Sequence, residues 1–260
     1  MGSNNGVTFK AGRYGGAGDA LHLLRVKDHA PSGCTPLGWL PANAEWGMIF
    51  DNEDWMWLKD ITSQTDPRFT WSLTETGANS STWSHIAGGQ EAKTDAASAD
   101  AIRFQMLKTY TPAAKKRAVA FARVEIDDVV DSDFRFGFYA TQTDPVSTEP
   151  LHGAYFWKAD NAATMIGRTN DAGASGTSTS TLATLVNATK FDICVGIDPT
   201  SGSAGTVFFC YKLASASSWT QVTKTTDFPA AATRFSFMLQ AGAAARKTAV
   251  FNKGFAWWEN

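Results

Sequence analysis

Two carboxylates in the stretch E-I-D-D-V-V-D, residues 125–131, have the spacing that acid–base chemistry on a glycosidic bond requires. Glu125 and Asp127 are two positions apart, so in an extended strand their side chains point to the same face. Two carboxylates about 5 Å apart on one face can serve as nucleophile and general acid in retaining glycoside hydrolysis. This stretch is therefore the first candidate for catalysis.

The same stretch resembles the E-x-D-x-x-E signature of one concanavalin-like glycoside hydrolase family, but the match is incomplete. The final glutamate of that signature is absent, and Val129 and Val130 stand where the catalytic strand should continue. Asp128, Asp131 and Asp133 are typical of the solvated end of a strand that turns into the next. We predict a charged turn here, and a protein that is not an enzyme.

Other acidic residues make a weak case for a metal site. Asp144, Asp160 and Asp171 fall at predicted loop tips, where calcium could take carboxylate and carbonyl oxygens. The chain has no D-x-D-x-D spacing, however, and Asp before Pro, Asn or Ala is ordinary turn chemistry. The four histidines are scattered without ligand spacing, and no nucleophile lies in a triad or elbow context. We expect no metal and no cofactor.

The three cysteines, Cys34, Cys194 and Cys210, are an odd number and too few for an extracellular disulfide framework. Cys194 and Cys210 each lie within an apolar strand, where a small buried hydrophobe is the ordinary interpretation and a cross-strand disulfide is the alternative. We predict reduced thiols that carry no chemistry.

Tryptophan supplies the remaining candidate for binding. Its density between Trp46 and Trp83 is too high for a solvated surface unless something covers it. An exposed indole can stack on a sugar ring, and Trp83 and Trp157 are the candidates for such stacking. The sequence does not separate a sugar-stacking tryptophan from one buried at a protein interface, so both interpretations stay open.

The overall composition excludes several partners. With 23 basic and 25 acidic residues the net charge is -2, which argues against nucleic acid or an anionic membrane as a partner. No run of about 18 apolar residues could span a membrane. The start MGSNNGVTFKAGRYGG lacks the features of a signal peptide, so we expect synthesis in the cytoplasm.

Strands of an antiparallel sandwich must position all of these residues. Phe134, Phe136 and Phe138 recur at every second position, and Phe235, Phe237 and Leu239 do the same, so one face of each strand is core. The pattern returns in GAYFWK, FDICVGID, GTVFFCYKL and KTAVFNKGFAW without a helical period between them. We predict an all-β jelly-roll sandwich of about twelve to fourteen strands over residues 46–260. Residues 1–45, rich in Gly and Pro, should form an irregular arm and ordered loops.

The stretches FGFYATQTDP (136–145), GAYFWKADNA (153–162) and FSFMLQAGAAARKTAVFNKGFAW (235–257) resemble tailed-bacteriophage structural proteins with a concanavalin-like or laminin-G-like jelly roll. The resemblance covers roughly residues 85–257. It implies a virion protein on the outer capsid surface, most plausibly a decoration or cement protein that binds the major capsid protein and bridges capsomers. A carbohydrate-binding module of a tail or head fibre is the alternative.

A cement protein needs an arm and aromatic anchors, because extended arms lie along partners and aromatics anchor interfaces. A trimer is our guess for the oligomeric state, since icosahedral heads have threefold sites. The candidate partner-binding residues are Phe9, Arg13, Tyr14, Trp39, Trp55 and Trp57.

Overall fold

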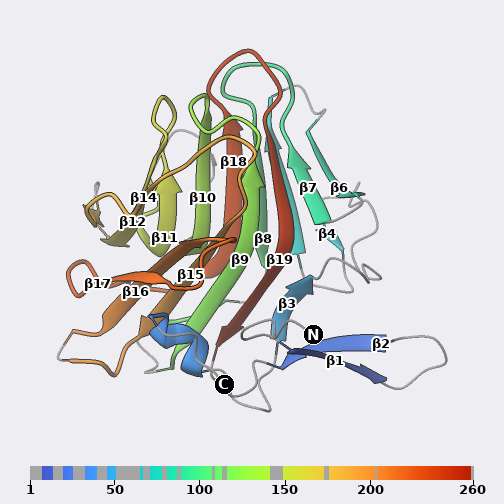
Figure 1. Cartoon of the computed structure of the whole chain (residues 1–260). Coiled ribbons are helices and arrows are strands. Elements are labelled where there is room, and N and C mark those ends of the chain that lie inside the picture. Colours follow the sequence, from blue (N-terminus) through green and yellow to red (C-terminus); the bar gives the residue numbers. More distant parts are fainter. Residues whose placement is uncertain are drawn as a thin grey trace.

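The computed structural model in Figure 1 is an antiparallel β-sandwich, which confirms the predicted fold class. The structure describes residues 8–13, 20–25, 33–39, 46–50, 65–66, 71–77, 81–86, 89–106, 109–112, 116–140, 149–172, 176–202 and 204–258. Two large sheets, called sheet 1 and sheet 2 below, pack face to face. Within the described residues, no helix is long and apolar enough to cross a membrane.

Sheet 1 carries the patch discussed below. Its strands run in the order β13 (Thr177–Ser178), β12 (Thr164–Asp171), β11 (His152–Lys158), β10 (Ser132–Tyr139), β18 (Arg234–Ala241), β8 (Ala101–Met106), β5 (Trp71–Thr76) and β4 (Thr65–Asp66), and β14 (Ala183–Thr184) pairs with β12.

Sheet 2 lies opposite and contains the longest strand described, β19. Its strands run in the order β17 (Thr220–Lys224), β16 (Thr206–Leu213), β15 (Phe191–Asp198), β9 (Ala118–Ile126), β19 (Thr248–Trp258), β7 (Gly89–Lys93) and β6 (Thr82–Ile86), and β3 (Trp46–Phe50) pairs with β19.

The core between the sheets is aromatic, as the alternation predicts. Phe134, Phe136 and Phe138 of β10 all belong to it. Trp83 of sheet 2 stacks on Phe104 of sheet 1 with ring centroids 5.0 Å apart. Such aromatic pairs contribute about 1 kcal/mol beyond the burial of their area. Rigid contacts of this kind fix which side chains of each strand point outward.

The first 45 residues are more regular than the sequence suggests. They contain the paired strands β1 (Thr8–Arg13) and β2 (Ala20–Arg25) and the 3-10 helix η1 (Thr35–Trp39). The structure therefore adds two short strands and a 3-10 helix to the arm and ordered loops expected here. The segments that pair are separated by YGGAGD, a short glycine-rich stretch of the kind that joins hairpin strands.

The strand count also exceeds the prediction, because the described residues include strands up to β19. Several of the additional strands, such as β4, β13 and β14, are two residues long and carry no alternation to detect. The final strand reaches Trp258, whose ring packs against Phe138 with centroids 6.4 Å apart. The carboxy-terminal FAWW segment is thus tied into the sandwich.

Candidate binding site

A patch of charged and aromatic side chains lies on the outer face of sheet 1. Because Phe134 and Phe136 enter the core, Asp133 and Arg135 point to the opposite face of β10. Register places Arg135 opposite Trp157 of β11, and the same face of the neighbouring strands adds Tyr155 and Arg168. With Glu149, which precedes β11, these residues form what we call the outer patch: Asp133, Arg135, Glu149, Tyr155, Trp157 and Arg168.

Trp157 is the centre of the outer patch. Its indole Nε1 donates a hydrogen bond of 3.1 Å to Oδ2 of Asp133, which fixes the plane of the ring. The guanidinium of Arg168 lies 5.3 Å from the ring centroid and that of Arg135 lies 5.9 Å from it. Both distances are within the range of cation–π attraction. The half-buried indole is therefore held rigidly at the surface of the sheet.

Glu149 organises the other side of the outer patch. Its carboxylate receives two hydrogen bonds from Arg168, the one from Nη2 measuring 2.6 Å, and a third of 3.2 Å from the Tyr155 hydroxyl. Burial opposes ionisation of Glu149, but the bonds and the charge of Arg168 outweigh it and lower the pKa of Glu149 below its usual value. A paired, oriented carboxylate at this position is a good acceptor for hydroxyl groups.

The pKa of Asp133 shifts in the opposite direction to that of Glu149. Its side chain lies beneath the patch, and burial raises its pKa, although Arg135 and the Trp157 indole partly offset this. Arg135 is also buried, with its Nε 3.5 Å from Oδ1 of Asp133. Asp133 and Arg135 thus support Trp157 from below, whereas Trp157, Arg168 and Glu149 reach the surface.

The two tryptophans proposed for sugar stacking differ in burial. Trp157 is half-buried, with the guanidinium groups of Arg135 and Arg168 over its ring. Trp83 is 1% exposed and enclosed by Phe104, Phe237 and Phe251, so neither face of its ring is open to a ligand. The expectation for Trp83 is corrected: an aromatic in the alternating strand TWSHI points into the core.

The predicted partner-binding residues are only partly described. Tyr14, Trp55 and Trp57 lie outside the described residues, and so do the side chains of Phe9 and Arg13. Trp39 is described, and it packs on its own chain: its ring meets Phe208 edge-on at 5.2 Å, and Arg117 lies 5.2 Å from the ring centroid. Its role in binding a partner stays a prediction.

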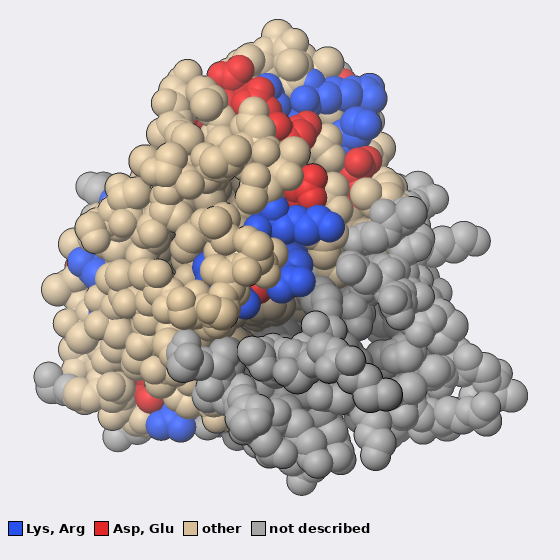
Figure 2. Space-filling model, in the orientation of Figure 1, with Lys and Arg blue, Asp and Glu red and all other residues tan. Residues whose placement is uncertain are grey.

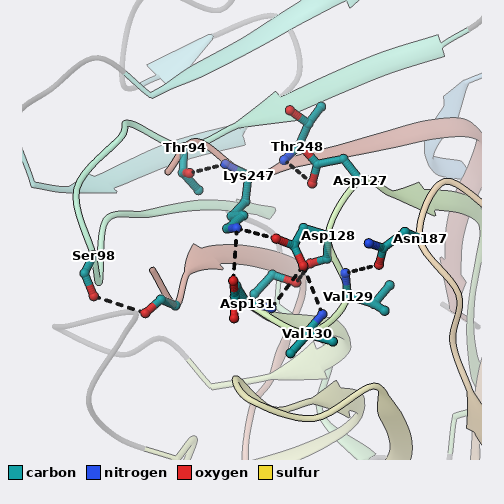
Figure 3. A network of polar contacts seen from close by, with 12 residues as sticks. Thr94, Ser98, Asp127, Asp128, Val129, Val130, Asp131, Asn187, Lys247 and Thr248 are labelled. Carbon is teal, nitrogen blue, oxygen red and sulfur yellow. Dashed lines mark hydrogen bonds and ion pairs between the residues drawn. The ribbon is translucent and has the colours of Figure 1, made fainter. Parts of the chain in front are cut away.

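The stretch E-I-D-D-V-V-D ends strand β9 with Glu125 and Ile126 and continues as the turn to β10, whose polar contacts Figure 3 shows. Asp127 accepts a 2.9 Å hydrogen bond from the backbone N–H of Thr248. Asp128 accepts one of 2.5 Å from the buried Lys247 and also receives the backbone N–H groups of Val130 and Asp131. These bonds hold a charged turn, as the sequence predicts.

A second buried lysine lies beside this turn. Nζ of Lys158 contacts the carbonyl and the hydroxyl of Ser132, the latter at 3.2 Å. Burial lowers the pKa of Lys158 to about 8, against the attraction of Asp133 and Asp160. Within the described residues, no group of three or more His, Cys, Asp or Glu side chains is arranged to hold a metal ion.

Basic and acidic residues alternate on the face seen in Figure 2 rather than forming a field of one sign. Arg123, for example, forms a double hydrogen bond with Asp192, at 2.6 and 2.9 Å. Among the described residues on this face, the mixture agrees with the net charge of -2.

No protein-family model matches the chain, and no curated protein matches it in sequence. Solved structures do match in fold. Peanut lectin, determined with a nine-residue peptide, is 11% identical with a TM-score of 0.52, and the match covers 84% of this chain and 100% of that one. Arcelin-5, a lectin-like defense protein from Phaseolus vulgaris, is 7% identical with a TM-score of 0.55, over 75% of this chain and 95% of that one. The lectin UEA-II complexed with galactose is 9% identical with a TM-score of 0.54, over 83% of this chain and 100% of that one.

The chain therefore has a legume-lectin-like, concanavalin-type jelly-roll fold. This confirms the concanavalin-like part of the resemblance found in the sequence. None of these three structures is described as a phage or capsid protein. At such low identity the likeness concerns the fold and leaves the activity to be argued from the site.

Proposed function

We propose that this protein is a carbohydrate-binding module of the lectin type, with the outer patch of sheet 1 as its binding site. The observation that carries the proposal is Trp157: a half-buried indole, fixed by Asp133 and flanked by two guanidinium groups. Sugar rings present apolar C–H faces edged by hydroxyl groups. An immobilised indole matches the first feature, and charged donors and acceptors match the second.

The comparisons with solved structures also support a carbohydrate-binding function. One of the structures that shares the fold is a lectin complexed with galactose. Fold likeness alone does not assign a function, so the argument depends on the chemistry of Trp157, Arg168 and Glu149. All three side chains are positioned by contacts within the chain, which reduces the entropy that a ligand must pay on binding.

A glycan array with the full chain, followed by titration of the strongest ligand, tests this proposal. Trp157→Ala should weaken binding by about fivefold or more, because stacking on an aromatic typically contributes about 1 kcal/mol. Trp39→Ala is a matched control, since Trp39 is also half-buried with a guanidinium over its ring, but lies against sheet 2. Equal losses in both variants, or an array without any binding, would count against the proposal.

Capsid decoration, with the major capsid protein as partner, stays a prediction from the sequence. Most of the residues on which it depends, among them Tyr14, Trp55 and Trp57, lie outside the described part of the chain. Cosedimentation with phage heads that lack the protein separates the two functions. Deleting residues 1–20 should leave a folded domain that binds heads poorly and binds glycans as before.

A further inference from the structure

The three cysteines, which are far apart in the sequence, meet on the outer face of sheet 2. Cys194 of β15 lies directly opposite Cys210 of β16 in the antiparallel register. Their neighbours Val195 and Phe209 belong to the core, so both thiols point away from it. The side chain of Cys34 lies close enough to both of them to interact with their thiols. All three thiols are free and buried.

The segment that carries Cys34, residues 33–39, covers this thiol cluster. The backbone N–H of Thr35 donates a 2.8 Å hydrogen bond to Oε1 of Gln221, and the Cys210 thiol donates to the same oxygen at 3.4 Å. This shared acceptor places the residue after Cys34 beside Cys210. The covering segment and Cys210 are therefore tied to the same acceptor.

Glycine at position 196 makes this close approach possible. A Cβ added to Gly196 would lie 2.3 Å from Cγ of Pro36, far below any normal contact. Trp39 completes the docking by packing on Phe208, one residue from Phe209. The 33–39 segment is thus seated on sheet 2 by polar and apolar contacts together, with exposed backbone at Gly33 and Thr35.

The three thiols are not equivalent. Burial opposes ionisation of Cys34, but its hydrogen bonds with Cys194 and Cys210 outweigh this and lower the pKa of Cys34 below its usual value. Burial raises the pKa of Cys194 and of Cys210. The thiolate is the reactive form of cysteine, and Cys34 lies in the covering segment whereas Cys194 and Cys210 lie in the strands beneath it, so Cys34 is the nucleophile of the cluster.

We propose that the cluster is a thiol–disulfide exchange site that opens when the 33–39 segment lifts from sheet 2, so that the otherwise buried Cys34 reacts with a low-molecular-weight disulfide and then forms a bond with Cys210. In the first step the Cys34 thiolate attacks one sulfur of the small disulfide, forms a mixed disulfide and releases one small thiolate. In the second step the Cys210 thiol loses its proton to solvent and attacks the Cys34 sulfur, releasing the second small thiolate. Two protein thiols are oxidised and one disulfide is reduced, so electrons balance. The product ties the 33–39 segment covalently to sheet 2.

The test uses the full reduced chain and oxidised glutathione under native conditions, with peptide mapping by mass spectrometry. We expect a Cys34–Cys210 disulfide in the wild type. Cys210→Ser should stop at a stable glutathione adduct on Cys34, and Cys34→Ser should form neither adduct nor disulfide. Cys194→Ser is the matched control and should still form the Cys34–Cys210 bond. A Cys194–Cys210 bond, a Cys34–Cys194 bond or an unreacted Cys34 would overturn the proposal.

A second measurement needs no variant. The disulfide would close a long loop of the chain, which restricts the unfolded state. The oxidised wild type should therefore melt about 5 to 10 °C higher than the reduced protein, and a reductant should reverse the shift. An unchanged melting temperature in a sample shown to contain the Cys34–Cys210 bond would contradict the idea that the bond locks a segment already seated in the fold.

Discussion

The outer faces of the two sheets differ in what covers their side chains. On sheet 1, charged and aromatic side chains satisfy one another and leave Trp157 half-buried at the surface. On sheet 2, the 33–39 segment of the chain itself covers the surface above Cys194 and Gly196. Under our proposal the polar surface around Trp157 serves a ligand, whereas the 33–39 segment covers the cysteines on sheet 2.

The largest effect should come from the ion pair on sheet 2. Arg123 pairs with Asp192, whose side chain is almost fully buried, and Lys212 is the more distant cation at 3.6 Å. Arg123→Ala leaves the Asp192 carboxylate underpaired in a buried position. It should cost about 3 kcal/mol of unfolding free energy, measured by urea denaturation, and leave glycan affinity unchanged. Loss of binding without loss of stability would reverse our assignment of the two faces.

A smaller effect is expected from Gly196→Ala, which places a methyl group against Pro36. The segment must shift, at a cost of about 1 to 3 kcal/mol, and the thiols beneath it become accessible. Alkylation of Cys34 and Cys210 by iodoacetamide should accelerate at least about tenfold. Unaltered labelling of a folded variant would mean that the segment does not protect the cluster.

The converse prediction concerns the outer patch of sheet 1. Arg168→Ala removes the partner of Glu149 and one of the two cations over Trp157. Because the Glu149 side chain left behind is 17% exposed, against 3% for that of Asp192, the loss of unfolding free energy should be only about 1 kcal/mol. Glycan affinity should fall by about tenfold in a titration. Equal changes for Arg168→Ala and Arg123→Ala, in both stability and binding, would erase the distinction between the faces.

The smallest expected effect is a loss of stability at acidic pH. The pKa of Glu149 is lower in the folded protein than in the unfolded chain, so its stabilising contribution is complete above its unfolded pKa and is lost as pH falls through the folded one. The loss below pH 4.5, the ordinary pKa of Glu149, should be about 1 kcal/mol or less. Glu149→Gln should abolish this part of the acid slope in denaturation curves. An identical slope in the variant would show that Glu149 does not contribute.

The strands could be predicted from the sequence better than the outer patch could. The boundaries of FDICVGID match β15, because eight apolar-rich residues lie between clear turns. In DFRFGFY, Asp133 and Arg135 alternate with core phenylalanines, so their outward position was available in the pattern. Glu149 was not predictable, because it reaches Arg168 from a connecting segment outside the strands.

Burial and long-range contacts explain the other features that could not be predicted from the sequence. Trp83 and Trp157 both lie in alternating strands, and the tertiary packing decides that Trp83 is enclosed while Trp157 is not. The cysteines were interpreted as inert because each was considered within its own strand. Their proximity depends on how residues 33–39 fold back over β15 and β16, and local periodicity carries no information about that.

The most direct test of the central claim is NMR of the tryptophan indole N–H groups while a glycan selected on the array is added. Our account predicts that the Nε1–H resonance of Trp157 shifts in a saturable way, that the resonance of the core residue Trp83 stays in place, and that Trp157→Ala removes the response. A saturable shift at Trp39 with none at Trp157 would place the ligand on the other sheet and contradict the account.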